Sequence, residues 1–453
     1  MKLEGKKVLV VGMARSGIAA AELMLDRGAV PVLNDRKKEE AFGRDLDSLR
    51  ATAAQFRLGE DPVALLRECD ALVISPGVPI TAPVVKAAAE KKMPMVGELE
   101  LAYQNLAGDV LAISGTNGKT TTTTLLGKIF ENAGRKTHVA GNIGYPLSSV
   151  AREAVKQDVT VIEVSSFQLE SIETFHPHVA ALLNITEDHL NRHGTMEEYI
   201  RLKQRMFENQ TEEDCAVLNM DDPTLFKMAP AIRSQIAWFS RTQKVENGAF
   251  VEDGKIVWQW KGSRSVICDI DQILIPGPHN LENALAASAM ACFAGVPAPV
   301  IRHTLMNFTG VEHRIEKVRV FEGVTYINDS KGTNVDSTIK AVQSMKAPTV
   351  ILLGGYDKHT DFMPLCREIV ASPWMSHVVV MGETARQIRE QLEEAGYERI
   401  EKAYSMEDAI MKARELSQPG GNVLLSPACA SFDMFRDYEQ RGDVFKQIVN
   451  ELK

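Results

Sequence analysis

Short apolar segments alternate with longer amphipathic ones along almost the whole chain. The apolar segments are KVLVVG, ALVISPG, VLAISG, VTVIEVSS, VAALLNIT, TVILLGG, HVVVMG and NVLLSPA. Continuous apolar runs of this length, bounded by glycine or small polar residues, predict parallel strands that are buried on both faces. The stretches between them predict helices, so the pattern indicates an α/β fold. In such folds ligands bind at the carboxyl ends of the strands.

Two breaks in this pattern predict three domains. A helix gives way to a new strand after MPMVGELELAYQNLAGD, and another helix ends before NFTGVEHR. We therefore expect an N-terminal Rossmann-like domain at residues 1–100, a central phosphate-loop domain with a mostly parallel sheet at 101–309, and a C-terminal Rossmann-like domain at 310–453. Residues 235–275 of the central domain alternate between apolar and polar positions, which predicts antiparallel strands.

Composition narrows the class of protein. A chain of 453 residues fits three domains of ~150 residues each. A hydrophobic fraction of 45% with 25% charged residues excludes disorder, and a net charge of −9 argues against a general nucleic-acid-binding protein. No segment predicts a signal peptide or a membrane span. The six cysteines are scattered without a C-x-x-C pair, so we expect reduced thiols in a cytoplasmic protein.

The strongest chemical signal is the segment GTNGKT at residues 115–120, which follows the predicted strand VLAIS. A helix with an apolar face follows it, and Gly134 is its expected end. A strand, a glycine loop and a helix start wrap backbone N–H groups around phosphate oxygens. Lys119 would neutralise phosphate charge, and the Thr120 hydroxyl would bind Mg²⁺. Ile113 stands where the general pattern has its first glycine, and the loop alone fits a kinase, an ATPase or a ligase equally well.

A lysine occupies the apolar stripe of another predicted helix. Residues 195–209 begin with Thr195 and have Glu198 three positions later, which predicts a capping box. Lys203 lies on the same stripe as Tyr199. A lysine on a buried face has to lose its charge, find a partner or act chemically. The pattern alone favours an ammonium that reaches solvent at the edge of the core.

Acidic residues and a histidine follow two neighbouring predicted strands. Glu163 ends VTVIEV, and the run Glu187-Asp188-His189 follows VAALLNIT. Such ligands beside a phosphate loop predict a Mg²⁺ site. An ammonium at position 203 would be repelled there, whereas a lysine carbamate formed with CO₂ would be an anionic ligand.

The N-terminal segment begins like a dinucleotide-binding fold. The loop GMARSG at residues 12–17 lies between a predicted strand and a helix, but Ala14 replaces the middle glycine of the usual pattern. Asp35 after the second strand suits a ribose hydroxyl. Taken alone, this domain favours a nicotinamide-dependent oxidoreductase.

In combination these motifs resemble the Mur ligase family, and the resemblance covers the whole chain in order. Its further motifs are PGPHNLENALAA, the pair HR at 313–314, NDSK at 328–331 and GGYDK at 354–358. The final segment SPACASFDMFRDYEQRGD resembles the members that add D-glutamate. The resemblance implies an ATP-dependent ligase that joins D-glutamate to UDP-N-acetylmuramoyl-L-alanine through an acyl phosphate in peptidoglycan precursor synthesis. Another Mur ligase or a folylpolyglutamate synthase is the alternative.

The resemblance also implies the roles of individual residues. The implied ATP-binding residues are Gly115, Thr116, Asn117, Gly118, Lys119, Thr120, Thr121, Asn280, Asn283, Arg314, Asp329 and Lys331. The residues implied for the UDP-linked substrate are Arg15, Ser16, Asp35, Arg36, Ser75, Gly77 and Asn142. Those implied for D-glutamate are Thr333, Lys358, Ser431 and Tyr438. The chain departs from the family at Tyr356-Asp357, where Asp-Gly is frequent, and at Tyr438, where another aromatic residue is common.

Two Mg²⁺ ions belong to the implied site. One would lie near Thr120 and Glu163, and the other near His189 and a carbamylated Lys203. The implied catalytic residues are Lys119, Asn142, Glu163, His189, Lys203 and, for positioning or proton transfer near the γ-phosphate, His313. We expect a monomer that binds small molecules, with no nucleic-acid partner and no membrane insertion.

Overall fold

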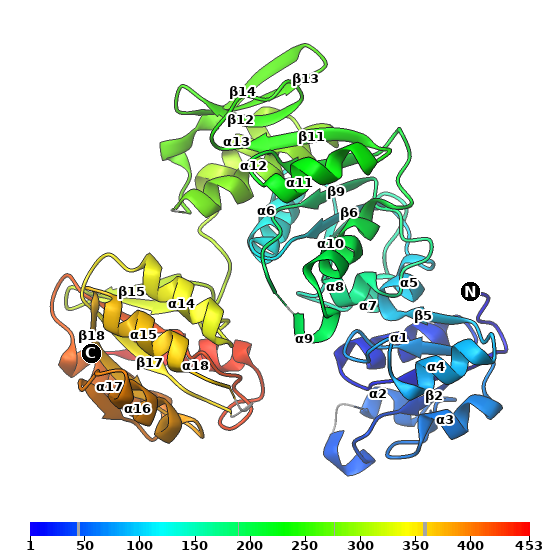
Figure 1. The fold of residues 1–453 in the computed structure, drawn as a ribbon, viewed down its shortest axis with the longest axis horizontal. Coiled ribbons are helices and arrows are strands. Elements are labelled where there is room, and N and C mark those ends of the chain that lie inside the picture. Colours follow the sequence, from blue (N-terminus) through cyan, green and yellow to red (C-terminus); the bar gives the residue numbers. More distant parts are fainter. Residues whose placement is uncertain (43–45, 189, 276, 357–359) are drawn as a thin grey trace. The chain divides into compact units, whose positions relative to one another are not determined.

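The computed structural model describes residues 1–42, 46–188, 190–275, 277–356 and 360–453. Backbone contacts divide the chain into two compact units, Met1–Phe308 and Thr309–Lys453 (Figure 1). The first unit contains two sheets and the second contains one, each flanked by helices, which confirms the predicted α/β class. No helix within these described ranges is long and apolar enough to cross a membrane. The domain boundary near residue 100 stays a prediction.

The first sheet of unit 1 is entirely parallel, with the strand order β3-β2-β1-β4-β5. Its strands are β1 Lys7–Val11, β2 Val30–Asn34, β3 Gln55–Phe56, β4 Ala71–Ile74 and β5 Met95–Gly97. Its helices are α1 Arg15–Asp26, α2 Asp47–Arg50, α3 Pro62–Leu65 and α4 Pro83–Glu90, with short 3₁₀ turns at Glu39–Phe42 and Leu66–Glu68. Val8 packs in the cluster that contains α1 residues, whereas Leu9 packs in the cluster that contains α4 residues. Helices on both faces therefore explain the continuous apolar strand.

The second sheet has nine strands in the order β14-β13-β12-β11-β10-β9-β6-β8-β7. Its strands are β6 Asp109–Ser114, β7 Thr137–Gly141, β8 Val159–Glu163, β9 Val179–Leu182, β10 Cys215–Asn219, β11 Gln235–Ser240, β12 Gly248–Glu252, β13 Lys255–Trp260 and β14 Ser263–Asp269. The prediction of antiparallel strands from residue 235 was wrong for β11, which is parallel to both β10 and β12. Helix α11, Pro223–Met228, lies between β10 and β11 and allows a parallel crossover.

The antiparallel part of this sheet begins at β12 because two tight hairpins follow. Asp253 and Gly254 join β12 to β13, and Lys261 and Gly262 join β13 to β14. All four have positive φ, which is the geometry of two-residue hairpin turns between antiparallel strands.

The remaining helices of unit 1 connect or cover its sheets. They are α5 Glu98–Tyr103, α6 Lys119–Asn132, α7 Leu147–Val150, α8 Ser166–Leu169, α9 Leu190–His193, α10 Met196–Gln204, α12 Pro278–Phe293 and α13 Ala298–Asn307, with 3₁₀ turns at Arg205–Phe207, Ala229–Ala231 and Ile270–Gln272. The predicted helix 195–209 thus becomes α10 and a 3₁₀ turn. The Thr195 hydroxyl caps it by accepting from the Glu198 amide at 3.2 Å, while the Glu198 carboxylate pairs with Arg201 at 2.7 Å.

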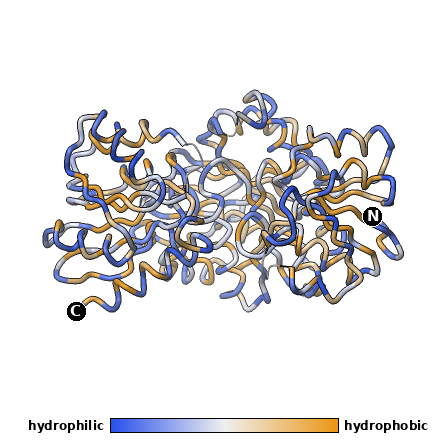
Figure 2. The backbone as a smooth tube through the Cα atoms, turned by 90° about the horizontal axis from the view of Figure 1, so that it is seen from below, coloured by the Kyte–Doolittle hydropathy of each residue, from blue (hydrophilic) through white to orange (hydrophobic). Residues whose placement is uncertain are grey.

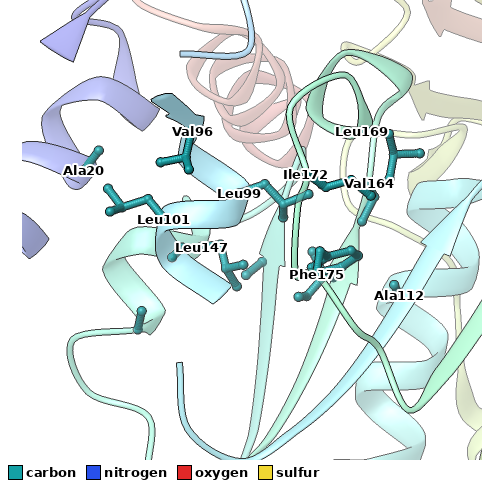
Figure 3. Packing of buried hydrophobic residues seen from close by; sticks show 14 of the residues in the cluster. Ala20, Val96, Leu99, Leu101, Ala112, Leu147, Val164, Leu169, Ile172 and Phe175 are labelled. Atoms are coloured by element: carbon teal, nitrogen blue, oxygen red, sulfur yellow. The ribbon is translucent and has the colours of Figure 1, made fainter. Parts of the chain in front are cut away.

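One apolar cluster joins the two sheets of unit 1 (Figure 3). Ala20 of α1, Leu99 and Leu101 of α5, and Leu147 of α7 belong to it together with Phe175. Because α5 leads from the first sheet into the second, its apolar side chains pack against elements of both.

Glu100 of α5 anchors this connection through hydrogen bonds. Its buried carboxylate accepts from the amides of Glu173 and Thr174 at 2.9 Å and from the amide of Phe175 at 3.1 Å. Burial raises the pKa of Glu100, but these donors outweigh burial and hold the pKa below its usual value. The ionised carboxylate therefore stabilises the folded state.

Replacement of Glu100 by Gln should lower the free energy of unfolding by about 2 kcal/mol at pH 7, because the amide loses charge-assisted hydrogen bonds. A depressed carboxyl pKa contributes stability above the unfolded pKa of about 4.3, and this contribution is lost as pH falls. The difference from wild type should therefore shrink below about pH 4. Urea unfolding of the full chain measures it, with exposed Glu90→Gln as control. An equal loss at pH 7 and pH 3.5 would contradict the charge assignment.

Unit 2 has a six-stranded sheet in the order β15-β16-β20-β17-β18-β19, parallel except between β15 and β16. Its strands are β15 Glu316–Phe321, β16 Val324–Asn328, β17 Thr349–Leu353, β18 Met375–Val380, β19 Ile400–Lys402 and β20 Asn422–Leu425. Its helices are α14 Val335–Ser344, α15 Met363–Ala371, α16 Ala385–Glu394, α17 Met406–Leu416 and α18 Tyr438–Glu451. Ile351 and Leu352 of β17 enter different apolar clusters, so this sheet is also covered on both faces. Figure 2 shows short hydrophobic stretches alternating with hydrophilic ones along the backbone.

Candidate functional site

The glycine loop lies between β6 and α6, as its sequence predicts. Gly118 adopts φ 84° immediately before the first residue of α6, Lys119. A Cβ atom at position 118 would lie 2.3 Å from Oδ1 of Asn283. Both the backbone conformation and this close approach require glycine. The start of α6 has the usual geometry for holding phosphate through backbone N–H groups, whereas the amides of Thr116 and Asn117 donate to the carbonyl and Oδ1 of Asn184 at 3.0 and 2.9 Å.

The predicted metal-binding side chains meet beside this loop. The Thr120 hydroxyl donates to Oε2 of Glu163 at 2.8 Å, and Nδ2 of Asn142 donates to Oε1 of Glu163 at 2.8 Å. Glu163 is the last residue of β8, and Asn142 follows β7. Parallel strands thus bring together three side chains that are distant in sequence.

Lys203 is buried, so the interpretation that the helix pattern alone favoured, an ammonium that reaches solvent, was wrong. Only 1% of the residue is exposed, and Nζ donates to the Gly115 carbonyl at 2.9 Å and to Oγ of Ser114 at 3.1 Å. Lys119 donates to the same Gly115 carbonyl at 2.8 Å. Burial first, and then the charge of Lys119, lower the pKa of Lys203 well below its usual value. The folded environment therefore favours the neutral amine far more than water does.

Two residues of this environment escaped the sequence reasoning. Ser114 donates to the Val164 carbonyl at 2.7 Å while it accepts from Lys203. The Tyr199 hydroxyl lies 3.1 Å from Oγ1 of Thr116 in the loop. Burial raises the pKa of Tyr199 to about 12, so the hydroxyl keeps its proton. The available signal was a tyrosine on a buried face, since such a hydroxyl needs a partner.

The asparagine pair of α12 faces the loop helix. Nδ2 of Asn283 donates to Oδ1 of Asn280 at 3.1 Å, and the Thr122 hydroxyl donates to Oδ1 of Asn283 at 3.2 Å. Thr121, which precedes Thr122 in α6, is buried as well. Both asparagines therefore lie at the mouth of the phosphate loop.

The residues expected to hold a UDP-linked substrate lie at the carboxyl edge of the first sheet. Asp35 accepts from the Met13 amide at 2.8 Å, and the Ser75 hydroxyl donates to the Gly12 carbonyl at 2.5 Å. Arg15 of α1 reaches the second sheet and donates to the Gly144 carbonyl at 2.8 Å. Ser16 is half-buried, and Gly77 and Arg36 are exposed. A Cβ atom added to Gly77 would have no neighbouring atom within 4 Å.

A small cleft opens beside Ser75, between elements of the two sheets of unit 1. Its lining residues are Ile74, Ser75, Pro76, Val78, Ile80, Gly97, Glu98, Leu99, Phe167, Gln168, Glu170 and Ser171.

In unit 2, Asp329 follows β16 and is buried. It accepts from the Ser426 hydroxyl at 2.6 Å and from the Ile315 amide at 3.2 Å. Burial raises the pKa of Asp329 to about 7, against the lowering effect of Ser426 and Arg314. A cationic or hydrogen-bonding ligand at this carboxylate would favour its ionised form.

His313 is buried near Asp329, with φ 61°. Its Nδ1 accepts from Nδ2 of Asn328 at 2.9 Å, and its ring packs edge-on against Tyr438 at 6.2 Å. Lys331 Nζ lies 5.5 Å from the centroid of the Tyr438 ring. Three predicted site residues therefore meet inside unit 2.

His313 also lies beside Glu312 and Asp443, a set spaced closely enough to hold a metal ion. The Lys446 ammonium already lies 3.4 Å from Asp443 and 3.8 Å from Glu316, and it contacts Glu312. A cation of the protein itself thus neutralises these carboxylates.

Arg441 of α18 is the functional candidate that the sequence reasoning missed in unit 2. It is 1% exposed and donates to Oγ and the carbonyl of Ser330 at 3.0 and 2.8 Å, and to the Ala430 carbonyl at 3.2 Å. It therefore links the loop that contains Thr333 to the loop that contains Ser431. Sequence gave one signal, an arginine four residues before Phe445 on a buried helix face.

Two predicted site residues, His189 and Lys358, lie outside the described residues. All other residues of the predicted sites fall into two groups, one in each unit of the chain.

The fold and the loop define a phosphate-loop nucleotide-binding enzyme of the α/β class. Family models match three consecutive parts of the chain: a Mur ligase MurD-like N-terminal domain at residues 6–97, a Mur ligase middle domain at 113–291, and a Mur ligase glutamate ligase domain at 313–429. The chain belongs to the Mur ligase family, whose members are ATP-dependent ligases that form amide bonds and use Mg²⁺.

Individual relatives extend this result. The UDP-N-acetylmuramoylalanine--D-glutamate ligases of a Thermoanaerobacter species and of Alkaliphilus oremlandii are each 46% identical over 455 residues, covering 100% of both chains. Among solved structures, UDP-N-acetylmuramate-alanine ligase from Thermotoga maritima aligns over 99% of this chain and 100% of its own, with 17% identity and a TM-score of 0.60. That similarity shows a shared fold.

Replacement of Gly118 by Ala should raise the KM for ATP about tenfold or more, because an added Cβ meets Asn283 and φ is positive. Gly134→Ala is the matched control, since Gly134 also has positive φ but no atom within 4 Å of an added Cβ. Steady-state kinetics with varied ATP measures the effect. Equal KM values for the two variants would show that the close approach of position 118 to Asn283 does not affect ATP binding.

Proposed function

We propose that this chain joins D-glutamate to UDP-N-acetylmuramoyl-L-alanine, using ATP, in peptidoglycan precursor synthesis. The observation that carries the proposal is the full-length match to relatives named for this reaction at 46% identity. The half-buried phosphate loop beside Glu163 and Lys203 supports the matching chemistry. Two rival functions each explain only one part of the chain. A nicotinamide oxidoreductase would explain the N-terminal domain, and an ATPase would explain the phosphate loop.

The reaction divides into two transfers. The carboxylate of the UDP-linked substrate attacks the γ-phosphate of ATP, which gives an acyl phosphate and ADP. The amine of D-glutamate then attacks the acyl carbon, and phosphate leaves from a tetrahedral intermediate. Lys119 would move from its loop carbonyls onto the phosphate oxygens and stabilise their charge.

Each substrate has its own group of residues. ATP would be held by residues 115–121 together with Asn280 and Asn283, and by Arg314, Asp329 and Lys331 from unit 2. Residues 15–16, 35–36, 75 and 77 and Asn142 would hold the UDP-linked substrate. Thr333, Lys358, Ser431 and Tyr438 would hold D-glutamate, and His313 would position groups near the γ-phosphate. Exclusion of water is needed because an acyl phosphate hydrolyses.

The donor set beside the phosphate loop fits Mg²⁺. The Thr120 hydroxyl and the Glu163 carboxylate, 2.8 Å apart, are hard oxygen ligands of the kind this ion prefers. Bound Mg²⁺ would supply charge stabilisation to the transferring phosphoryl group. We assign one ion to Thr120 and Glu163 and a second to His189 and residue 203.

Carbamylation of Lys203 makes the second assignment consistent. A bare ammonium would repel a metal ion, but an amine whose pKa is lowered by burial more readily loses its proton and can then capture CO₂. The carbamate carries a negative charge and two oxygens, which suit Mg²⁺. Its neighbours Ser114 and Gly115 already hold Nζ at the loop.

We also propose that the enzyme is a cytoplasmic monomer. A monomer suffices because all residues implied for substrate binding belong to this one chain. Sedimentation that shows a stable dimer at assay concentrations would contradict it.

In the proposed reaction, phosphate release from ATP depends on the UDP-linked substrate and D-glutamate together. Phosphate should appear only with ATP, UDP-N-acetylmuramoyl-L-alanine and D-glutamate all present, because acyl transfer requires both acceptor and donor. L-glutamate, L-alanine and diaminopimelate serve as controls. Release without an amino acid would favour an ATPase, and preference for another amino acid would favour a different Mur ligase.

Lys203 variants test the carbamate. Lys203→Ala should lose activity at least about a hundredfold, and a short carboxylic acid in solution should restore part of it. Lys203→Arg should fail as well, because guanidinium stays charged and forms no carbamate. Wild-type protein in ¹³C-bicarbonate should give a carbamate carbon signal that Lys203→Ala lacks. Full activity of the Arg variant, or no such signal in active wild type, would exclude carbamylation.

A further inference from the structure

Arg192 lies in α9 of unit 1, three residues after His189 in the sequence. Its guanidinium forms two hydrogen bonds with the Glu170 carboxylate, Nη2 to Oε2 at 2.6 Å and Nε to Oε1 at 3.1 Å. The guanidinium carbon also lies 4.5 Å from the centroid of the Phe167 ring. A bidentate ion pair and a stacking ring fix the orientation of this side chain in two ways.

The partner carboxylate is itself fixed. The Glu170 side chain is only 4% exposed and follows helix α8 directly. Arg205 donates to the backbone carbonyls of Leu169 at 2.7 Å, Glu170 at 2.9 Å and Ile172 at 2.7 Å. The segment that holds Arg192 is therefore tied by hydrogen bonds to the 3₁₀ turn that follows α10.

The outer edge of the Arg192 guanidinium faces the first sheet. Nη2 lies 3.5 Å from the carbonyl oxygen of Pro76 and 3.4 Å from that of Val78. This turn after β4 closes through a hydrogen bond from the Val78 amide to the Ser75 carbonyl at 2.9 Å. A Cβ atom added to Gly12 would lie 3.0 Å from Cβ of Ser75, so the turn packs tightly on the first glycine loop.

We propose that Arg192 is a positioning residue for the UDP-linked substrate: it sets the turn 75–78 of the first sheet against helices α8 and α9, which follow strands β8 and β9 of the second sheet. This inference rests on the proposed function, because it assigns the substrate that the turn holds. The turn, Phe167 and Glu170 all line the same cleft. Arg192 thus acts from behind the cleft wall and does not contact the substrate.

Arg192 is not needed merely to join the two sheets. The shared apolar cluster already joins them, and Arg152 forms a second ion-pair bridge to Glu22 and Asp26 of α1 at 2.5 Å. What distinguishes Arg192 is its contact with the carbonyls of the turn. Its removal should therefore change substrate alignment more than stability.

The test compares three variants of the full chain. Arg192→Gln removes the charge and the fork, Arg192→Lys keeps the charge without the planar fork, and Arg152→Gln removes the other bridge between the sheets. The measurements are the KM values for UDP-N-acetylmuramoyl-L-alanine and for ATP, the Kd of the UDP-linked substrate by calorimetry, and the thermal unfolding temperature.

Arg192→Gln should raise the KM and the Kd for the UDP-linked substrate about tenfold and change the KM for ATP less than about twofold. Arg192→Lys should recover only part of the affinity, because an ammonium cannot reproduce the bidentate fork. Arg152→Gln should bind this substrate like wild type.

Three results would overturn the inference. Unchanged affinity in Arg192→Gln would show that the turn needs no support, and an equal loss in Arg152→Gln would show that any bridge between the sheets has this effect. A parallel rise of both KM values together with a lower unfolding temperature would make Arg192 structural. Wild-type protein that fails to bind the UDP-linked substrate would instead overturn the proposed function, and the inference with it.

Discussion

Two lysine side chains converge on one backbone carbonyl at the end of β6, and this contact constrains the site. Lys119 and Lys203 both donate to Gly115, and Lys203 is buried. Two ammonium groups that share one carbonyl repel each other, and this repulsion adds to burial in lowering the pKa of Lys203. The charges of Lys119 in the loop and Glu163 at the end of β8 therefore both act on Lys203 of α10.

Hydrogen bonds to backbone groups maintain the surrounding geometry. Glu100 holds the segment 173–175, Arg205 holds the segment 169–172, and Arg441 holds two loops of unit 2. Glu100 and Arg441 are buried and Arg205 is half-buried, and each charged group forms most of its hydrogen bonds with peptide groups. Such groups are costly to bury unless they are fully bonded, and once bonded they fix loop conformation. Loops of both units are therefore placed by charged side chains that bond backbone groups.

Hydrophobic pattern and turn chemistry were sufficient for the elements and the sheet class. Continuous apolar strands such as β1 and β17 predicted sheets covered on both faces, and the structure has them. The alternating pattern over 235–275 predicted strands but not the direction of β11. Direction depends on the connection, and the short helix α11 leaves little trace in the apolar pattern.

The sequence by itself determined which residues are chemically capable: the loop 115–120, Glu163, and a lysine on an apolar stripe. Only the tertiary structure decided which of them meet, because periodicity shows that a face is buried without showing what covers it. The Lys203 amine proved to lie inside, against Ser114 and Gly115, rather than at the surface. Contacts such as Arg192 with Val78 join positions more than a hundred residues apart, and packing of separate segments alone creates them.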